Sequence, residues 1–105
     1  MVSPRNLEHP TAEEMSLDLV LSALADPIRR TIVAQLSCGH EDQRCIAFAL
    51  PVSKSTTTHH FRVLREAGVI SQHYRGTSIL NNLRTADLNL RFPGLLDAVL
   101  GAAAD

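Results

Sequence analysis

The apolar residues of this chain recur at helical spacing as far as Ala67, and they then alternate with polar residues from Val69 to Leu83. Such alternation predicts two β-strands, and the polar stretch Tyr74–Thr77, which contains Gly76, predicts the turn of a hairpin. A chain of 105 residues has room for one domain. We therefore expect a mainly α-helical domain with a β-hairpin, which is an α+β fold.

Two helices are expected in the first part of the chain. The first runs from about Ser16 to Ala25, where four apolar residues share one face. They are Leu17, Val20, Leu21 and Leu24. The second begins at Pro27, which suits a first helical position, with Asp26 as its N-cap. We expect Arg29 and Arg30 on a solvated or salt-bridged face of this second helix.

The next two helices form the expected helix-turn-helix. After the loop GHEDQR, the segment CIAFAL predicts a short third helix over residues 45–50, which Pro51 ends. The fourth helix spans Ser53–Ala67, with Ser53 as its N-cap and Gly68 just past its end. Its inward face carries apolar residues at helical spacing, with Thr57 beside them. Those apolar residues are Phe61, Leu64 and Ala67.

Two further elements are expected after the hairpin. Thr85 is expected to cap a short turn, and Pro93 is expected to start a last helix. The resulting order of elements is that of a winged helix-turn-helix over residues 16–105. Residues 1–15 contain two prolines and show no periodicity, so we expect a flexible N-terminal arm there.

The front of the expected fourth helix is crowded with short polar side chains, although threonine is a poor helix former. Helical spacing places several of them on the side opposite the core. These outward residues are Ser55, Thr58, His59 and Arg62. Short hydroxyl side chains at a helix N-terminus let the backbone approach the major groove of DNA, where their oxygens can bond phosphates and base edges.

Positive charge gathers in the same part of the chain, although the net charge is only −1. Residues 54–75 hold four basic residues against Glu66 alone. Phosphate binding depends on such a local patch more than on the total charge. At the hairpin tip, Tyr74 and Arg75 can reach a phosphate or the minor groove. The expected DNA-binding residues are Lys54, Ser55, Thr56, Thr58, His59, Arg62, Tyr74 and Arg75.

Three segments read LSALADPIRRTIVAQL, VSKSTTTHHFRVLREAGVI and HYRGTSILNNL. Together they resemble the ArsR/SmtB family of bacterial transcriptional regulators, over roughly residues 16–100. The resemblance implies a homodimer through the first and last helices, double-stranded operator DNA as partner, repression, and release by a metal ion or another inducer. It places the recognition helix at Ser53–Ala67 and the wing at Ile70–Leu83.

The apolar faces of the first and last helices also favour a homodimer. The expected last helix adds Leu95, Leu96, Val99 and Leu100 to the apolar residues of the first. A domain this small gains stability by burying such surface against a partner. We therefore expect residues 16–105 to form a DNA-binding and dimerisation domain.

The metal sites of the family are not reproduced in this sequence. One family site uses a Cys-x-Cys pair on the third helix, where this chain has alanine at the second ligand position, Ala47. The other uses Asp and His ligands on the last helix, and residues 93–105 contain no histidine. His59 and His60 are adjacent, so their side chains point about 100° apart on a helix and cannot chelate one ion. We expect no metal site and no cofactor.

Cys38 and Cys45 leave three interpretations open. They can be small buried hydrophobic residues. They can form a thiol–disulfide switch, because a helix N-terminus and a neighbouring cation such as Arg44 favour the reactive thiolate. They can also bind a metal with His40 and Glu41 in a non-standard site, although the spacing fits no strong zinc pattern. The effector is therefore open between an oxidant, a metal, another small molecule or none.

Other functional classes lack their sequence features. An enzyme is not expected, because the chain has no phosphate-binding loop, no carboxylate pair in an apolar setting and no nucleophile with a base and an orienting group. No apolar run approaches a membrane span, and the N-terminus does not read as a secretory signal, so we expect a cytoplasmic protein. The rival function is a winged helix that binds another protein instead of DNA. An uncharged recognition face would favour that rival, and Lys54, Arg62 and Arg75 oppose it.

Overall fold

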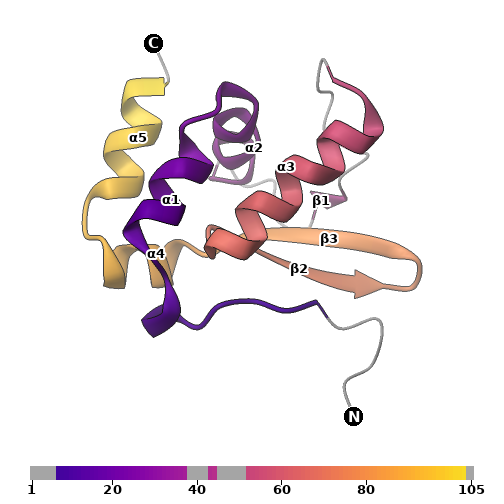
Figure 1. The fold of residues 1–105 in the computed structure, drawn as a ribbon, viewed down its shortest axis with the longest axis horizontal. Helices are drawn as coiled ribbons and strands as arrows, with labels where there is room; N and C mark the ends of the chain where they lie inside the picture. The colour runs from indigo at the N-terminus through magenta and orange to yellow at the C-terminus, as the bar shows by residue number, and fades with distance from the viewer. Residues whose placement is uncertain (1–6, 38–42, 45–51, 104–105) are drawn as a thin grey trace.

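The computed structural model describes residues 7–37, 43–44 and 52–103 (Figure 1). Its elements are η1 (Ala12–Glu14, a 3-10 helix), α1 (Leu17–Leu24), α2 (Pro27–Ser37), β1 (Gln43–Arg44), α3 (Lys54–Ala67), β2 (Ile70–Arg75), β3 (Ser78–Leu83), α4 (Thr85–Arg91) and α5 (Leu95–Ala103). The expected fold class, mainly α with a β-hairpin wing, is confirmed. The helix expected over residues 45–50 lies outside the described residues, and so do Cys38 and Cys45.

The wing is the antiparallel hairpin of β2 and β3, residues 70–83, with Arg75 opposite Ser78 at its tip. Gly76 has φ 64°, the left-handed conformation that the turn requires and that glycine adopts without strain. A third strand, β1, pairs antiparallel with β3, which gives the strand order β1-β3-β2. The sequence placed this strand in a loop, because a strand of two residues is too short for alternation to show.

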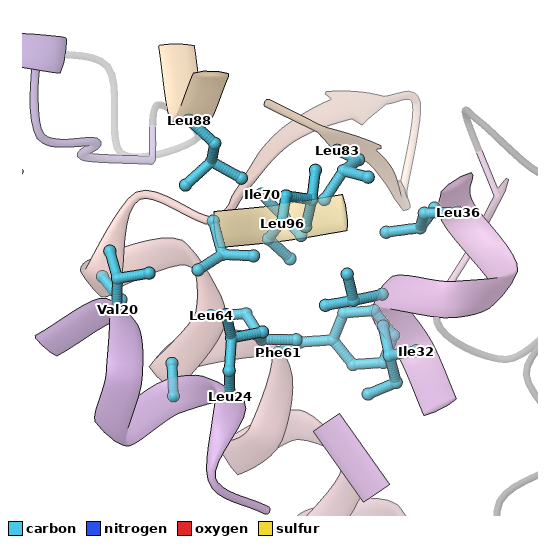
Figure 2. Packing of buried hydrophobic residues seen from close by; sticks show 14 of the residues in the cluster. Val20, Leu24, Ile32, Leu36, Phe61, Leu64, Ile70, Leu83, Leu88 and Leu96 are labelled. Carbon is cyan, nitrogen blue, oxygen red and sulfur yellow. The ribbon is translucent and has the colours of Figure 1, made fainter. Parts of the chain in front are cut away.

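The hydrophobic core lies where α1, α2 and α3 meet the sheet (Figure 2). Phe61 and Leu64 on α3 are 1% and 0% exposed, so the inward face of α3 is fixed by packing. Around them lie Val20, Leu24, Ile32, Leu36, Ile70, Leu83, Leu88 and Leu96. Val20, Leu24 and Leu96 therefore belong to the core of the monomer and not to the surface that we assigned to a partner.

The ends of α2 and α3 follow the sequence. Asp26 Oδ1 accepts the N–H groups of Ile28 (2.8 Å) and Arg29 (3.1 Å) at the start of α2. Ser53 Oγ accepts the Thr56 N–H at 3.2 Å at the start of α3. Gly68 ends α3 with φ 88°, and an added Cβ there would meet Met15 at 3.0 Å. Both N-caps and the glycine end are confirmed.

Two expected helix starts are displaced. The N-cap of α4 is Arg84, without a side-chain cap bond, and Thr85 is the first helical residue. α5 begins at Leu95, not at Pro93, because Gly94 adopts φ 83° between them and interrupts the helical backbone. In the described part of the chain, no helix is both long and apolar enough to cross a membrane.

The segment before α1 packs against the domain. Met15 is 2% exposed, and its carbonyl accepts from Arg91 Nη2 at 2.8 Å. The Pro10 carbonyl accepts from Arg84 Nη1 at 2.7 Å. Aperiodic sequence gives no sign of such contacts, because they depend on residues more than 70 positions away. The flexibility of an arm over residues 1–15 stays a prediction, and residues 1–6 lie outside the described residues.

Candidate nucleic-acid interface

The start of α3 is stabilised by its own short side chains. Ser53 Oγ accepts the Thr56 N–H and donates to Thr56 Oγ1 at 2.9 Å. Thr58 Oγ1 donates to the Lys54 carbonyl at 3.0 Å, four residues earlier. Because its hydroxyl proton is used inside the helix, the Thr58 oxygen presents acceptor lone pairs to any ligand. The polar cluster is thus both a helix start and an acceptor-rich surface.

All eight residues that we expect to contact DNA are exposed. Six lie on α3 (Lys54, Ser55, Thr56, Thr58, His59 and Arg62), and two lie at the end of β2 (Tyr74 and Arg75). Thr57 is half-buried and Phe61 is buried, which confirms the expected orientation of α3. In Figure 1 the first turn of α3 and the hairpin tip both lie toward the right-hand side of the molecule.

The two adjacent histidines of α3 have different environments. His59 is exposed, whereas His60 is 7% exposed, and their ring centroids are 5.9 Å apart. His60 Nδ1 lies 3.1 Å from Arg29 Nη1. A guanidinium only donates, so Nδ1 of His60 is the acceptor in this contact. His60 is therefore part of the packing between α2 and α3, and His59 remains on the outer face.

We expected Arg29 and Arg30 on a solvated or salt-bridged face of α2, and this prediction was wrong. Both are half-buried, and their guanidinium groups donate to the last carbonyls of α1. Arg29 Nε bonds Ala23 O at 2.6 Å, and Arg30 Nη1 bonds Leu24 O at 2.9 Å. The last carbonyls of a helix lack partners within the helix, and cationic donors satisfy them well. This contact could have been predicted from the sequence, because the two arginines stand about one turn after the expected end of the first helix.

The Asp26 carboxylate completes this junction. Burial raises the pKa of Asp26, but the N–H bonds from Arg29 and Ile28 and the charge of Arg29 outweigh burial and lower it. Asp26 therefore stays ionised and caps α2 at neutral pH. The junction of α1, α2 and α3 is built from a capping carboxylate, two arginines and one buried histidine.

Three of the four basic residues in the segment 54–75 are exposed: Lys54, Arg62 and Arg75. The fourth, Arg65, is half-buried, and its Nη1 donates to Gln72 Oε1 at 3.0 Å. Arg65 thus joins α3 to the wing, whereas the other three remain available to a phosphate backbone. The positive patch therefore has three basic side chains on the outer surface, and not the four that the charge distribution along the sequence predicts.

Within residues 7–37, 43–44 and 52–103, no group of three or more His, Cys, Asp or Glu side chains is arranged to hold a metal ion. The redox candidates Cys38 and Cys45, and the metal candidates His40 and Glu41, lie outside these ranges.

Known proteins are similar to this chain in sequence and in fold. The family model described as "Bacterial regulatory protein, arsR family" matches residues 26–72. "Transcriptional repressor SdpR" of Bacillus subtilis is 38% identical over 69 residues, which are 66% of this chain and 77% of SdpR. "HTH-type transcriptional repressor SmtB" of Mycobacterium tuberculosis is 38% identical over 89 residues, which are 82% of this chain and 62% of SmtB. This chain thus spans less than two thirds of the length of SmtB.

A solved structure points the same way. The protein described as "Possible transcriptional regulator for arsenical resistance" superposes with a TM-score of 0.60 at 29% identity, covering 86% of this chain and all of that one. The named relatives are regulators, which is a non-enzymatic role, as we expected. The chain therefore belongs to the arsR family of bacterial regulatory proteins, and it is a transcriptional regulator of the ArsR/SmtB type.

Proposed function

We propose that this regulator is a homodimeric repressor that binds double-stranded operator DNA with α3 in the major groove and the wing beside it. The observation that carries the proposal is the exposed surface formed by the first turns of α3 and the tip of β2, which holds hydroxyl oxygens and three cationic side chains. An uncharged face would instead suit a protein partner, so the exposed cations support DNA.

The roles within this surface follow from chemistry. Lys54 and Arg62 neutralise phosphates, and this positions α3 on the duplex without reading sequence. Thr58 presents an acceptor oxygen, which suits the N6 amino group of adenine or the N4 amino group of cytosine. His59 and Ser55 lie on the same outer face and add base or phosphate contacts. Arg75 and Tyr74 extend the contact to a neighbouring phosphate or to the minor groove.

The homodimer is supported by apolar surface that the monomer leaves open. On α1, Leu17 and Leu21 are 47% and 44% exposed and lie four residues apart on one face. On α5, three apolar side chains remain half-buried: Leu95, Val99 and Leu100. A second copy that covers α1 and α5 would bring two α3 helices to half-sites about one helical turn, roughly 34–36 Å, apart.

We also propose a thiol response through Cys38 and Cys45 inside the cytoplasm. Its support is the sequence context of the two cysteines and the pairing of Arg44 with Leu80, which connects the residue before Cys45 to the wing strand β3. A disulfide needs Cα atoms within about 7 Å. Diamide should weaken operator binding of the wild type and leave the Cys38→Ser, Cys45→Ser double variant unaffected. Equal responses of the two proteins, or weakening by a chelator in place of diamide, would contradict the thiol response.

Selection from a random-sequence duplex library tests the main proposal. The wild type should enrich an inverted repeat, bind it far more tightly than an unselected duplex, and lose affinity steeply with salt. Equal affinity for the selected and unselected duplexes would overturn the proposal and favour a protein-binding module.

A further inference from the structure

A chain of polar side chains links α3 to the base of the wing. Arg65, near the end of α3, donates from Nη1 to Gln72 Oε1 on β2 at 3.0 Å. Gln72 in turn donates from Nε2 to Asn81 Oδ1 on β3 at 2.8 Å. Gln72 and Asn81 are opposite each other in the hairpin register. One side chain on β2 therefore connects the recognition helix to both strands of the wing.

The backbone of Gln72 makes a further contact on the other side of the strand. β2 is an edge strand, since β3 lies between β1 and β2. At this free edge, the Gln72 N–H donates to His9 Nε2 at 2.9 Å. Gln72 is thus bonded to α3 through Arg65, to β3 through Asn81, and to the N-terminal segment through His9.

The burial of these groups makes their geometry restrictive. Gln72 is 5% exposed and Asn81 is 0% exposed, so water cannot replace a lost partner easily. Apolar contacts tolerate sliding of one element over another, whereas a buried amide that moves leaves its donor or acceptor without a partner. The chain Arg65–Gln72–Asn81 therefore disfavours other angles between α3 and the wing.

We propose that Gln72 is a positioning residue that holds the wing at a fixed angle to α3, so that Arg75 at the tip reaches the DNA that α3 occupies. The proposal rests on the proposed DNA binding. Arg75 is three residues beyond Gln72 on β2, so a small rotation at Gln72 displaces the tip. The free energy of the Arg75 contact then depends on the link between Arg65 and Gln72.

A double-variant cycle tests this dependence. Operator affinity is measured with and without Arg75→Ala in four backgrounds: wild type, Arg65→Met, Gln72→Met and Ser71→Ala. Gln72→Met keeps the side-chain length and removes the link, Arg65→Met keeps an unbranched apolar stem and removes the guanidinium, and Ser71→Ala is the matched control on the same strand. The probe is the duplex selected from the random library. Circular dichroism shows which variants are folded.

We expect Arg75→Ala to weaken binding about 3–10-fold in the wild type and in Ser71→Ala, but less than about twofold in either linker variant. Because Arg65 is only half-buried whereas Gln72 is buried, we expect Arg65→Met to remain folded even where Gln72→Met does not. An undiminished Arg75 effect in Arg65→Met would overturn the proposal, and so would the absence of any Arg75 effect in the wild type.

A measurement without DNA separates this proposal from the proposed function. Residual dipolar couplings of the free protein report the orientation of the hairpin relative to α3. Arg65→Met should reduce the couplings of the hairpin amides, and Ser71→Ala should not. If the wild type fails to discriminate DNA sequences while the couplings change, the proposed function is wrong and the link is real. Unchanged couplings in Arg65→Met would show that Gln72 does not hold the wing.

Discussion

Arg29 Nη1 lies 3.1 Å from Nδ1 of His60, and the same guanidinium donates from Nε to Ala23 O and from Nη2 to Ser22 O. One side chain on α2 therefore satisfies the end of α1 and a buried ring in the middle of α3. Since α1 is a proposed dimer helix and α3 the proposed recognition helix, Arg29 stabilises the part of the fold that connects dimerisation to DNA binding.

Replacing Arg29 should destabilise the protein. Arg29→Ala removes the donor of Ala23 O and of the His60 acceptor, whereas Ser22 O keeps the Ala25 N–H, and we expect the variant to lower the free energy of unfolding by about 2–4 kcal/mol. Urea denaturation measures the change. Arg62→Ala is the matched control: Arg62 is exposed on α3, so its replacement should change the stability by less than about 0.5 kcal/mol. Equal stability losses in the two variants would contradict this role of Arg29.

Exposed cations on α3 should act on all DNA sequences alike. Lys54→Ala or Arg62→Ala removes one phosphate contact, so each should weaken operator and random DNA by similar factors and reduce the salt slope by about 1. Titrations over a range of salt concentrations measure both quantities. Asp97→Asn on α5 is a control that changes the net charge by one unit elsewhere, and it should leave the slope unchanged.

Thr58 should contribute to discrimination between sequences. Thr58→Ala removes the acceptor oxygen that faces outward, and the preference for the operator over a mismatched duplex should fall by about 1–3 kcal/mol. Thr31→Ala is a close control, because Thr31 Oγ1 donates to Pro27 O at 3.0 Å as Thr58 Oγ1 does to Lys54 O. The control separates a lost helix bond from a lost base contact. A similar loss of preference in Thr31→Ala would remove Thr58 from the readout.

Features of the fold that depend on neighbouring residues could be predicted from the sequence. Ser53, Asp26 and Gly68 were identified because a cap depends on residues within three positions of it. The outer face of α3 was identified because helical spacing is a local property. β1 was missed because two residues carry no period, and the start of α5 was displaced because Pro93 suits a helix start, whereas the left-handed Gly94 follows it.

Contacts between residues that lie far apart in the sequence could not be predicted from its local patterns. The bond between Arg29 and His60 spans 31 positions, and that between His9 and Gln72 spans 63. The residues that neighbour Arg29 and His9 in the sequence do not indicate these partners. The sequence therefore predicted that Arg29 lies on the surface and that His9 belongs to an arm. The sequence predicted four basic residues in one patch over residues 54–75. Arg65 does not share the outer surface with the other three, because its guanidinium bonds the buried Gln72 amide on the wing.

The contact between His9 and Gln72 should make stability depend on pH. His9 Nε2 accepts the Gln72 N–H, which requires a neutral ring. Burial lowers the pKa of His9 below 6.5, and the charges of Arg65 and Arg84 lower it further, against the opposing bond to Leu7. The unfolded chain therefore takes up the proton first. The contribution of this contact is fully present above pH 6.5, and it is lost as the pH falls through the lowered value.

Unfolding measured by urea between about pH 5 and pH 8 tests this dependence. Wild type should lose stability below pH 6.5, and His9→Ala should lose less over the same interval. His59→Ala, which removes an exposed histidine, should retain the wild-type profile. Glu8, Glu14, Arg65 and Glu66 also face this region, and the bonds from Thr11 lower the pKa of Glu14 below 4.5. Superimposable profiles of wild type and His9→Ala would contradict the assignment.

The exposed leucines of α1 should determine the oligomeric state. Leu21→Glu places a charge on the face that Leu17 shares, and it should convert the dimer to a monomer because a buried, unpaired carboxylate is costly. The monomer should stay folded, since Leu21 is 44% exposed and Val20 and Leu24 form the core side of the helix. Sedimentation measures the mass, and circular dichroism the fold. Leu90→Glu is the control: Leu90 is 73% exposed on α4, and its replacement should leave the dimer intact.

Loss of the dimer in Leu21→Glu should also lower operator affinity, because a single α3 reaches only one half-site. A monomeric wild type at micromolar concentration would contradict the homodimer, and a dimer that survives Leu21→Glu would place the dimer interface elsewhere.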